Sequence, residues 1–376
     1  MTTAETVLIV DHQLPTPDRD SGSLRQHRII EELLGLGHQV LYFPLNATAG
    51  PAYADRLRQL GVGVLGDRRQ QERFLAVEGH RLGVALLCRP EPAVEMLARV
   101  RDNAPGCLVV YDTVDVHFHR LRRQAALAAA EGAPDRYVVR ARAESMRALE
   151  LLLVRECDVA LVVSEEERRL LLDEAPGASV EVLSNIHRPV PPSGAPTRST
   201  GIVFVGNYLH QPNTDAARWL CAEVMPAVWR EVPEATVDLV GDGASPAIMA
   251  LAGDRVTVHG WVPDLTPLYA RARVAVAPLR YGAGVKGKVG EAVEHGVPVV
   301  GTPIAFEGMG LVAGRDVLAG ETAAEVAAHL VRVLRDDALA LRLARSAGPA
   351  LASRCDTAAA RATLVRLLAR RATALI

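Results

Sequence analysis

The chain alternates short apolar runs with longer amphipathic stretches, and this pattern occurs twice. In the first half, Thr6–Val10, Gly83–Cys88 and Cys107–Tyr111 have the composition of buried strands, and Leu24–Leu36 carries apolar residues at helical spacing. The same alternation starts again at Gly201–Val205. Buried strands that alternate with helices are typical of parallel sheets with crossover helices. The sequence therefore predicts an α/β protein with two doubly wound, Rossmann-like domains.

A proline-rich segment separates the two halves. Residues 188–200 contain four prolines and show no apolar periodicity, which indicates a linker. We expect a first domain at residues 1–187, the linker at 188–200 and a second domain at 201–355. Residues 356–376 should form a C-terminal helix that packs back on the first domain. Ligands of doubly wound sheets bind beyond the carboxyl ends of the strands, so we expect the domains to face a cleft.

Charge and composition exclude several classes of protein. The net charge is −2 and the basic residues are dispersed, which argues against a nucleic-acid partner. No run of 18 apolar residues indicates a transmembrane segment. The first residues do not have the pattern of a secretory signal, so we expect a cytoplasmic protein. The five cysteines are scattered without metal spacing, and no Asp-x-Asp triplet suits a metal, so no metal site is predicted.

The chain has only two lysines, Lys286 and Lys288; the remaining 40 of its 42 Lys and Arg residues are arginines. Both lysines lie in a glycine-rich segment. A lysine ammonium is a compact charge that suits a phosphate oxygen, and glycine lets backbone N–H groups approach an anion closely. We interpret residues 282–291 as a phosphate site. The alternative is that two surface lysines persist there without a role.

Two general phosphate motifs overlap this segment, and both are incomplete. A Gly-x-Gly-x-x-Gly spacing starts at Gly282, but it has no acidic strand-end residue about 20 positions on, as a dinucleotide fingerprint requires. The start of a P-loop begins at the same glycine, but Val289 stands where a Ser or Thr would bind magnesium. The segment follows the apolar run Val274–Pro278 and precedes a short helix, which favours an anion at the helix N-terminus.

Glu291 lies one helical turn after Lys288, so the two side chains can face the same ligand. A carboxylate just beyond a phosphate site can accept hydrogen bonds from a ribose diol. The alternative is a first-turn glutamate that only complements the helix dipole.

Several segments, in order, resemble landmarks of GT-B glycosyltransferases of the glycosyltransferase family 4 type. The resemblance covers most of the chain and is strongest over residues 201–312. It is carried by Gly37–Val40 (G-H-Q-V), Asp158–Ser164, Phe204–Asn207, Val240–Gly243, His259–Asp264 and the pattern G-x-x-x-K-V-x-E-A-x-x-x-G-x-P-V-V over Gly284–Val300. Each segment alone is common, whereas the ordered set is specific.

The resemblance implies a nucleoside-diphosphate sugar donor, bound mainly by the second domain, and an acceptor that is a small molecule, a glycan or a lipid-linked molecule. The donor is a substrate, and no cofactor is expected. A lipid-linked acceptor would bring peripheral contact with a membrane. Lys288, helped by Lys286 and Arg280, would hold the diphosphate, and Glu291 would hold the ribose.

Other positions complete the expected donor site. The backbone at Trp261 and Val262 would meet the base, and Glu307 would reach the sugar. Gly206 and Asn207 would line the floor near the diphosphate. Gly22 would allow close approach to the phosphates and Arg25 would add a charge there. An ordinary capped loop, with Ser21 or Ser23 as the cap, is the alternative for that segment.

One position departs from the family pattern. Many members carry two glutamates eight positions apart, and the partner of Glu291 would be residue 283, which is Ala283 here. The sugar contact made by that glutamate is therefore absent, and backbone amides of the turn that contains Gly282 and Gly284 would substitute.

Polar side chains follow the strand Cys107–Tyr111, and they are the candidates for catalysis. Asp112, Asp115 and His117 could orient or deprotonate an acceptor hydroxyl. The alternative is a hydrogen-bonded strand-end carboxylate beside solvated histidines.

With these residues in place, the resemblance implies a metal-independent, retaining glycosyltransferase, most simply a hexosyltransferase, that acts on an acceptor hydroxyl or a similar nucleophile. Two alternatives stay open at this point. One is a sugar-nucleotide epimerase of similar fold. The other is a non-catalytic sugar-nucleotide sensor, which is supported by Ala283 in place of the usual glutamate.

Overall fold

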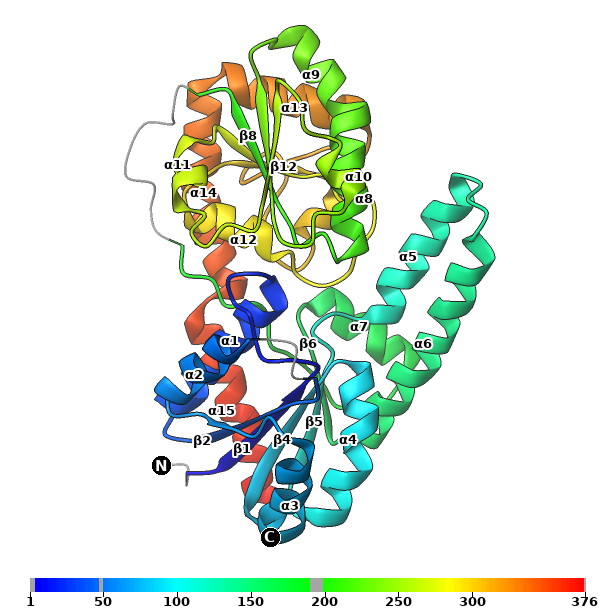
Figure 1. Cartoon of the computed structure of the whole chain (residues 1–376), viewed down its shortest axis with the longest axis vertical. Coiled ribbons are helices and arrows are strands. Elements are labelled where there is room, and N and C mark those ends of the chain that lie inside the picture. Colours follow the sequence, from blue (N-terminus) through cyan, green and yellow to red (C-terminus); the bar gives the residue numbers. More distant parts are fainter. Residues whose placement is uncertain (1–3, 47–49, 190–198, 375–376) are drawn as a thin grey trace. The chain divides into compact units, whose positions relative to one another are not determined.

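The computed structural model describes residues 4–46, 50–189 and 199–374. The chain divides into two compact units, each built around one sheet (Figure 1). The N-terminal unit contains Met1–Pro17, Gly22–Ile186 and Thr357–Ile376, and the C-terminal unit contains Asp18–Ser21 and His187–Asp356. Residues 190–198 of the predicted linker lie outside the described residues.

The N-terminal unit is built from parallel strands and crossover helices. Its strands are β1 (Thr6–Asp11), β2 (Gln39–Pro44), β3 (Gly63–Val64), β4 (Leu82–Cys88), β5 (Leu108–Asp112), β6 (Val159–Val162) and β7 (Val180–Val182). Its helices are α1 (Ser21–Gly35), α2 (Pro51–Gln59), α3 (Arg68–Glu78), the 3₁₀ turn η1 (Gly79–Arg81), α4 (Pro90–Asn103), α5 (His117–Ala130), α6 (Arg136–Glu156), α7 (Glu165–Glu174) and α15 (Thr357–Ala374).

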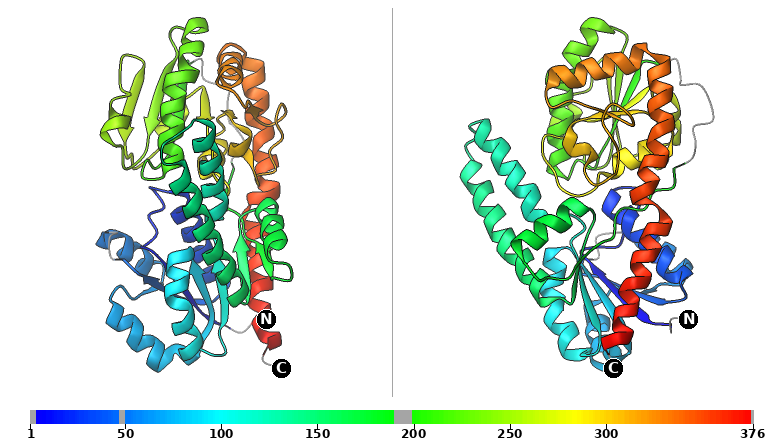
Figure 2. Two further views of the ribbon diagram at one scale, coloured as in Figure 1. Left: turned by 90° about the vertical axis from the view of Figure 1, so that its right-hand side faces the viewer. Right: turned by 180° about the vertical axis from the view of Figure 1, so that it is seen from behind.

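The strands of this sheet are parallel and follow the order β3-β2-β1-β4-β5-β6-β7. Side chains alternate between its faces, because successive residues of a strand point to opposite sides. Val7 and Ile9 pack with α1, α2 and α15, whereas Leu8 and Val10 pack with α3, α4, α6 and α7. Figure 2 shows α15 running along this sheet, and α5 and α6 forming a hairpin that projects beyond it.

The C-terminal unit repeats the same plan. Its strands are β8 (Gly201–Val205), β9 (Thr236–Val240), β10 (Val256–Gly260), β11 (Val274–Ala277), β12 (Val299–Gly301) and β13 (Leu318–Ala319). Its helices are α8 (Gln211–Trp219), the π-helical turn η2 (Leu220–Val224), α9 (Met225–Glu231), α10 (Pro246–Met249), α11 (Thr266–Arg271), α12 (Gly287–Glu294), the 3₁₀ turn η3 (Pro303–Phe306), α13 (Ala323–Arg335) and α14 (Asp337–Cys355).

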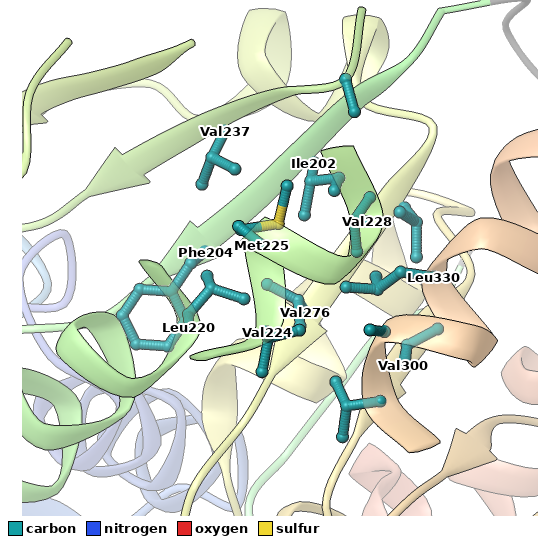
Figure 3. Packing of buried hydrophobic residues seen from close by; sticks show 14 of the residues in the cluster. Ile202, Phe204, Leu220, Val224, Met225, Val228, Val237, Val276, Val300 and Leu330 are labelled. Atoms are coloured by element: carbon teal, nitrogen blue, oxygen red, sulfur yellow. The ribbon is translucent and has the colours of Figure 1, made fainter. Parts of the chain in front are cut away.

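Its strands are parallel in the order β10-β9-β8-β11-β12-β13. One face of the sheet is sealed by an apolar cluster (Figure 3). Phe204, Val237 and Val276 from the strands meet Leu220 and Leu330 from the helices, and these side chains are almost fully buried. The helix α11 contacts β8, and α12 contacts β11.

The predicted fold class of two doubly wound parallel sheets is confirmed. The strongly patterned elements appear close to their predicted bounds, such as β4 and β8. The short helix expected after the glycine-rich segment is α12, which begins at Gly287 with Lys286 as its N-cap. The C-terminal helix α15 belongs to the N-terminal unit.

Candidate functional site

The reversal of strand order in the C-terminal unit lies between β8 and β11. Loops that leave the carboxyl ends of two such strands diverge, and the space between them is where doubly wound sheets bind ligands. The loop after β8 carries Gly206 and Asn207, and the loop after β11 carries residues 278–286. The fold thus brings together the two segments that the sequence singled out for a diphosphate.

Both lysines are held against the protein instead of extending into solvent. Lys286 is 7% exposed and occupies the N-cap position of α12. Its Nζ donates a hydrogen bond to the Gly284 carbonyl oxygen at 2.5 Å and lies 3.8 Å from Glu307 Oε2. Gly284 adopts φ +69°, a conformation that glycine tolerates and most residues do not. Lys286 therefore fastens the turn that leads into α12.

Lys288 is half-buried on the first turn of α12. Its Nζ donates to Asn213 Oδ1 at 2.7 Å and lies 5.7 Å from the centre of the Phe204 ring. Both of these partners are neutral. Burial, together with the nearby Lys286 charge, lowers the pKa of Lys288 to about 7, and Glu291 opposes this shift. Glu291 offsets this only in part, so an anion bound here would supply further counter-charge.

The floor beside Lys288 depends on two glycines. A Cβ on Gly206 would lie 2.8 Å from Asn213 Cγ, and a Cβ on Gly241 would lie 2.0 Å from the Gly206 carbonyl oxygen. Asn213 in turn donates from Nδ2 to the Asn207 carbonyl oxygen at 2.8 Å. The turns after β8 and β9 therefore pack against each other with no room for side chains, which leaves their backbone accessible to a ligand.

Glu291 already has a partner in the structure. The buried Tyr269 hydroxyl forms a hydrogen bond with it, and burial together with this carboxylate raises the pKa of Tyr269 well above its usual value. The Tyr269 ring stacks on His295 with ring centres 4.5 Å apart. The predicted ribose contact would share Glu291 with Tyr269, and it stays a prediction.

A pocket brings four of the predicted donor residues together. Gly206, Asn207, Trp261 and Val262 all line it. Trp261 is 39% exposed, so its ring offers an apolar surface to a flat ligand such as a nucleobase. Its position is fixed because Nε1 donates to the Asp18 carbonyl oxygen at 3.1 Å.

Arg19 and Asp242 also line this pocket. The Arg19 guanidinium lies over the Trp261 ring, 4.8 Å from its centre, and its NH1 contacts Asp242 Oδ2 at 2.5 Å. Neither residue was among the donor-site residues predicted from the sequence. The position of Asp242 directly beyond a strand end was the available signal.

Arg280 and Glu307 each face a residue of opposite charge. Arg280 forms a two-point ion pair with Asp215 of α8, with Nε donating to Oδ2 at 2.9 Å. It is therefore anchored by a carboxylate, and any contact with a diphosphate would have to form beside that pair. Glu307 follows η3 and faces Lys286. Gly282 is buried in the same turn.

In the N-terminal unit, Arg25 of α1 is buried and its NH1 contacts Asp112 Oδ2 at 2.7 Å. Arg25 also donates from NH2 to the Leu183 carbonyl oxygen at 2.8 Å. Gly22 lies one turn earlier, partly buried. The predicted phosphate contact of Arg25 and the predicted catalytic role of Asp112 would both have to compete with this ion pair.

Asp115 and His117 meet in the loop after β5, where His117 Nε2 lies 3.2 Å from Asp115 Oδ1. Asp115 also pairs with Arg120. Val114 between them and the strand adopts φ +62°, which is strained for a β-branched residue and is often found at functional sites. The structure therefore favours Asp115 and His117 over Asp112 as candidates to orient or deprotonate an acceptor hydroxyl.

A buried carboxylate holds this loop in place. Glu150 of α6 accepts hydrogen bonds from the backbone N–H groups of His117 and Phe118 and from the Tyr111 hydroxyl. Burial raises the pKa of Glu150. These contacts fix the start of α5, so the His117 ring is carried on a rigid support.

Asn213 is a further residue of the site that was not predicted from the sequence. It is 6% exposed on α8 and links Lys288 to the turn after β8. The available signal was its place in the first turn of α8, the helix that follows β8. Nothing in the sequence indicated that it would reach a lysine 75 positions away.

The arrangement of two parallel doubly wound units is the GT-B fold, as comparison with solved structures shows. Sucrose-phosphate synthase from Thermosynechococcus elongatus is 16% identical with a TM-score of 0.70, and the match covers 98% of this chain and 100% of that one. Anabaena HepE in complex with UDP and glucose is 15% identical with a TM-score of 0.70, covering 97% and 100%. A mutant of S. aureus TarM, in complex with fondaparinux, alpha-GlcNAc-glycerol and UDP, is 9% identical with a TM-score of 0.70, covering 97% and 99%.

The sequence itself matches a family over the C-terminal unit. Residues 199–336 match the family described as glycosyl transferases group 1. The resemblance to GT-B glycosyltransferases seen in the sequence is thus confirmed. No curated protein matches the chain significantly.

Among the described residues, no group of three or more His, Cys, Asp or Glu side chains is arranged to hold a metal ion. No helix within those same ranges is both long and apolar enough to cross a membrane.

Proposed function

We propose that this protein is a retaining glycosyltransferase that moves a sugar, most simply a hexose, from a nucleoside-diphosphate sugar to an acceptor hydroxyl or similar nucleophile. The family match of residues 199–336 and the GT-B fold support a glycosyltransferase. HepE and TarM were solved with UDP, which makes UDP-sugars the first donors to test here.

The observation that carries the proposal is the environment of Lys288. Its ammonium lies at the carboxyl end of the sheet, at the reversal of strand order, with the Asn213 amide and the Phe204 ring as neutral partners. A half-buried cation whose ammonium contacts neutral groups is costly unless a ligand supplies a counter-charge close by. A diphosphate matches this site in charge, and the pocket that Trp261 lines matches the adjoining nucleoside.

The same arrangement suits the chemistry of transfer. Breaking the bond between the sugar and the phosphate builds negative charge on the departing diphosphate. Fixed cations and backbone N–H groups that are already in position stabilise that charge without reorganisation. Lys288 supplies the cation, the start of α12 supplies N–H groups, and Lys286 holds the turn in shape. In this proposal the protein's own cations, and not a metal ion, stabilise the leaving group.

Retention of configuration is proposed through attack on the same face, with the leaving phosphate accepting the proton of the acceptor. This route needs no covalent nucleophile. Asp112, which comes first after β5, is held by Arg25 in a buried ion pair and is poorly placed to act as one. His117, supported by Asp115, would orient the acceptor hydroxyl.

A panel of nucleotide sugars, tested first by thermal shift and then for transfer, checks the proposal. Binding of one class of donor should raise Tm, because a ligand that binds only the folded state stabilises it. The stabilising donor should then lose its sugar in the presence of simple acceptors, and the anomeric proton of the product should show retention. Conversion of the donor to an epimer without an acceptor would contradict transfer. Binding without any turnover would favour the sensor alternative.

A further inference from the structure

We propose that Asn213 is a positioning residue that aims the Lys288 ammonium at the diphosphate while leaving its charge intact. This inference rests on the proposed function, since it assumes that a diphosphate binds at Lys288. It assigns a role to a residue of α8 that lies outside both the lysine segment and the segments that carry the family resemblance.

The orientation of the Asn213 amide is fixed by its surroundings. Nδ2 donates to the Asn207 carbonyl oxygen at 2.8 Å, so Oδ1 must point the other way, where it accepts from Lys288 Nζ at 2.7 Å. The side chain also packs closely against Gly206, since a Cβ at that position would lie 2.8 Å from Asn213 Cγ. A buried amide with both ends bonded has one stable orientation.

The neutrality of the amide matters as much as its position. An aspartate has nearly the same shape, but its carboxylate would pair with the ammonium and cancel the charge meant for the ligand. It would also face the Asn207 carbonyl oxygen without a proton to donate. An asparagine therefore holds the lysine by hydrogen bonding alone. Burial and the nearby Lys286 charge lower the pKa of Lys288 to about 7, and the neutral amide adds no negative charge that would raise it again.

Asn213 also couples Lys288 to the turn after β8. Asn207 Oδ1 accepts from the Leu209 N–H at 2.9 Å, and Gly206 and Asn207 line the pocket beside Trp261. The amide thus connects the cation to the backbone that lines this pocket. A neighbour on the same helix provides a natural comparison, since Thr214 Oγ1 donates to the Tyr208 carbonyl oxygen at 2.8 Å without reaching Lys288.

The small number of lysines makes the test direct. Carbon-13-labelled lysine places signals at only two positions in the chain, and Lys288→Met identifies the one from Lys288. The pH titration of that signal would be followed in the wild type, Asn213→Asp and Thr214→Val. Affinity for inorganic pyrophosphate and for UDP would be measured by calorimetry on the same proteins. Asn213→Ser, which is too short to reach both partners, provides a second variant if Asn213→Asp fails to fold.

Asn213→Asp should raise the pH at which Lys288 titrates and weaken pyrophosphate binding by about 10-fold or more, in line with the loss of one charge-assisted contact. Asn213→Ser should weaken binding less. Thr214→Val should bind like the wild type and titrate like it, even where it lowers Tm. A retained wild-type affinity in Asn213→Asp, or equal losses in Asn213→Ser and Thr214→Val, would overturn the inference.

Failure of the inference can be told apart from failure of the proposed function. If Lys288→Met and the wild type bind pyrophosphate and UDP equally, the diphosphate site itself is wrong, and both proposals fall. If Lys288→Met loses affinity while the Asn213 variants keep it, the diphosphate site stands and only the role of Asn213 is rejected.

Discussion

At the scale of single residues, Lys288 should matter most for donor binding. Lys288→Met is expected to weaken nucleoside-diphosphate binding by about 1.5–3 kcal/mol, the usual range for a hydrogen bond to a charged group. Calorimetric titration with UDP measures this. Arg335→Ala, which removes a cation on α13 that pairs with Glu231 at the surface, is the matched control and should bind as the wild type does. Equal losses in both variants would point to a general charge effect.

The same substitution should stabilise the protein most at acidic pH. Lys288 has its pKa lowered from 10.5 to about 7 on folding, so the folded chain binds fewer protons between those values. The cost of the buried charge is then full below about pH 7 and fades as the pH rises toward 10.5. Lys288→Met removes this cost. Its gain in Tm over the wild type should be largest near pH 6 and smallest near pH 10, and a gain that is flat with pH would contradict the low pKa.

Some residues of the site could be predicted from the sequence and others could not. The strong bias toward arginine made Lys286 and Lys288 conspicuous, and both are turned inward beside the strand reversal. The ion pairs of Arg280 with Asp215 and of Arg25 with Asp112 could not be foreseen, because each joins residues at least 65 positions apart. Asn213 was missed for the same reason. Such partners are decided by tertiary packing and not by local pattern.

At the scale of elements, the packing of α12 can be tested through Gly290. In the middle of a helix, Gly→Ala normally stabilises by about 0.5–1 kcal/mol. At Gly290 a Cβ would lie 2.2 Å from His187 Nε2, and His187 is buried. Gly290→Ala should therefore destabilise the protein by about 1–3 kcal/mol through overpacking. Thermal or urea unfolding measures the change.

The control is the same substitution at Gly35, at the end of α1, where a Cβ would meet nothing within 4 Å. Gly35→Ala should be neutral or slightly stabilising. If both variants change stability by the same amount and in the same direction, the close contact between α12 and His187 does not set the position of this helix.

Strands and helices with long apolar patterns were predictable, and short edge strands were not. β1, β5 and β8 are five or six residues long and appear where their apolar runs predict them. The edge strands β3 and β13 have only two residues each, which is too short for an alternating pattern to show. The order and register of the strands were not predicted, because contacts between distant segments set both.

At the scale of the whole molecule, transfer should not depend on a divalent metal. In the proposed mechanism, Lys288 and the start of α12 stabilise the leaving diphosphate. Activity should therefore survive EDTA with less than about a 2-fold loss, a change of less than about 0.5 kcal/mol in the barrier. Activity assayed with and without EDTA, and then with added magnesium, checks this. Complete loss with EDTA, restored by magnesium, would contradict the mechanism.

The most direct test of the central claim is a structure of the protein with UDP bound. The account predicts a phosphate oxygen within hydrogen-bonding distance of Lys288 Nζ, the base beside Trp261, and Asn213 still bonded to the Asn207 carbonyl oxygen. UDP bound elsewhere, or bound with no phosphate oxygen near Lys288, would contradict it.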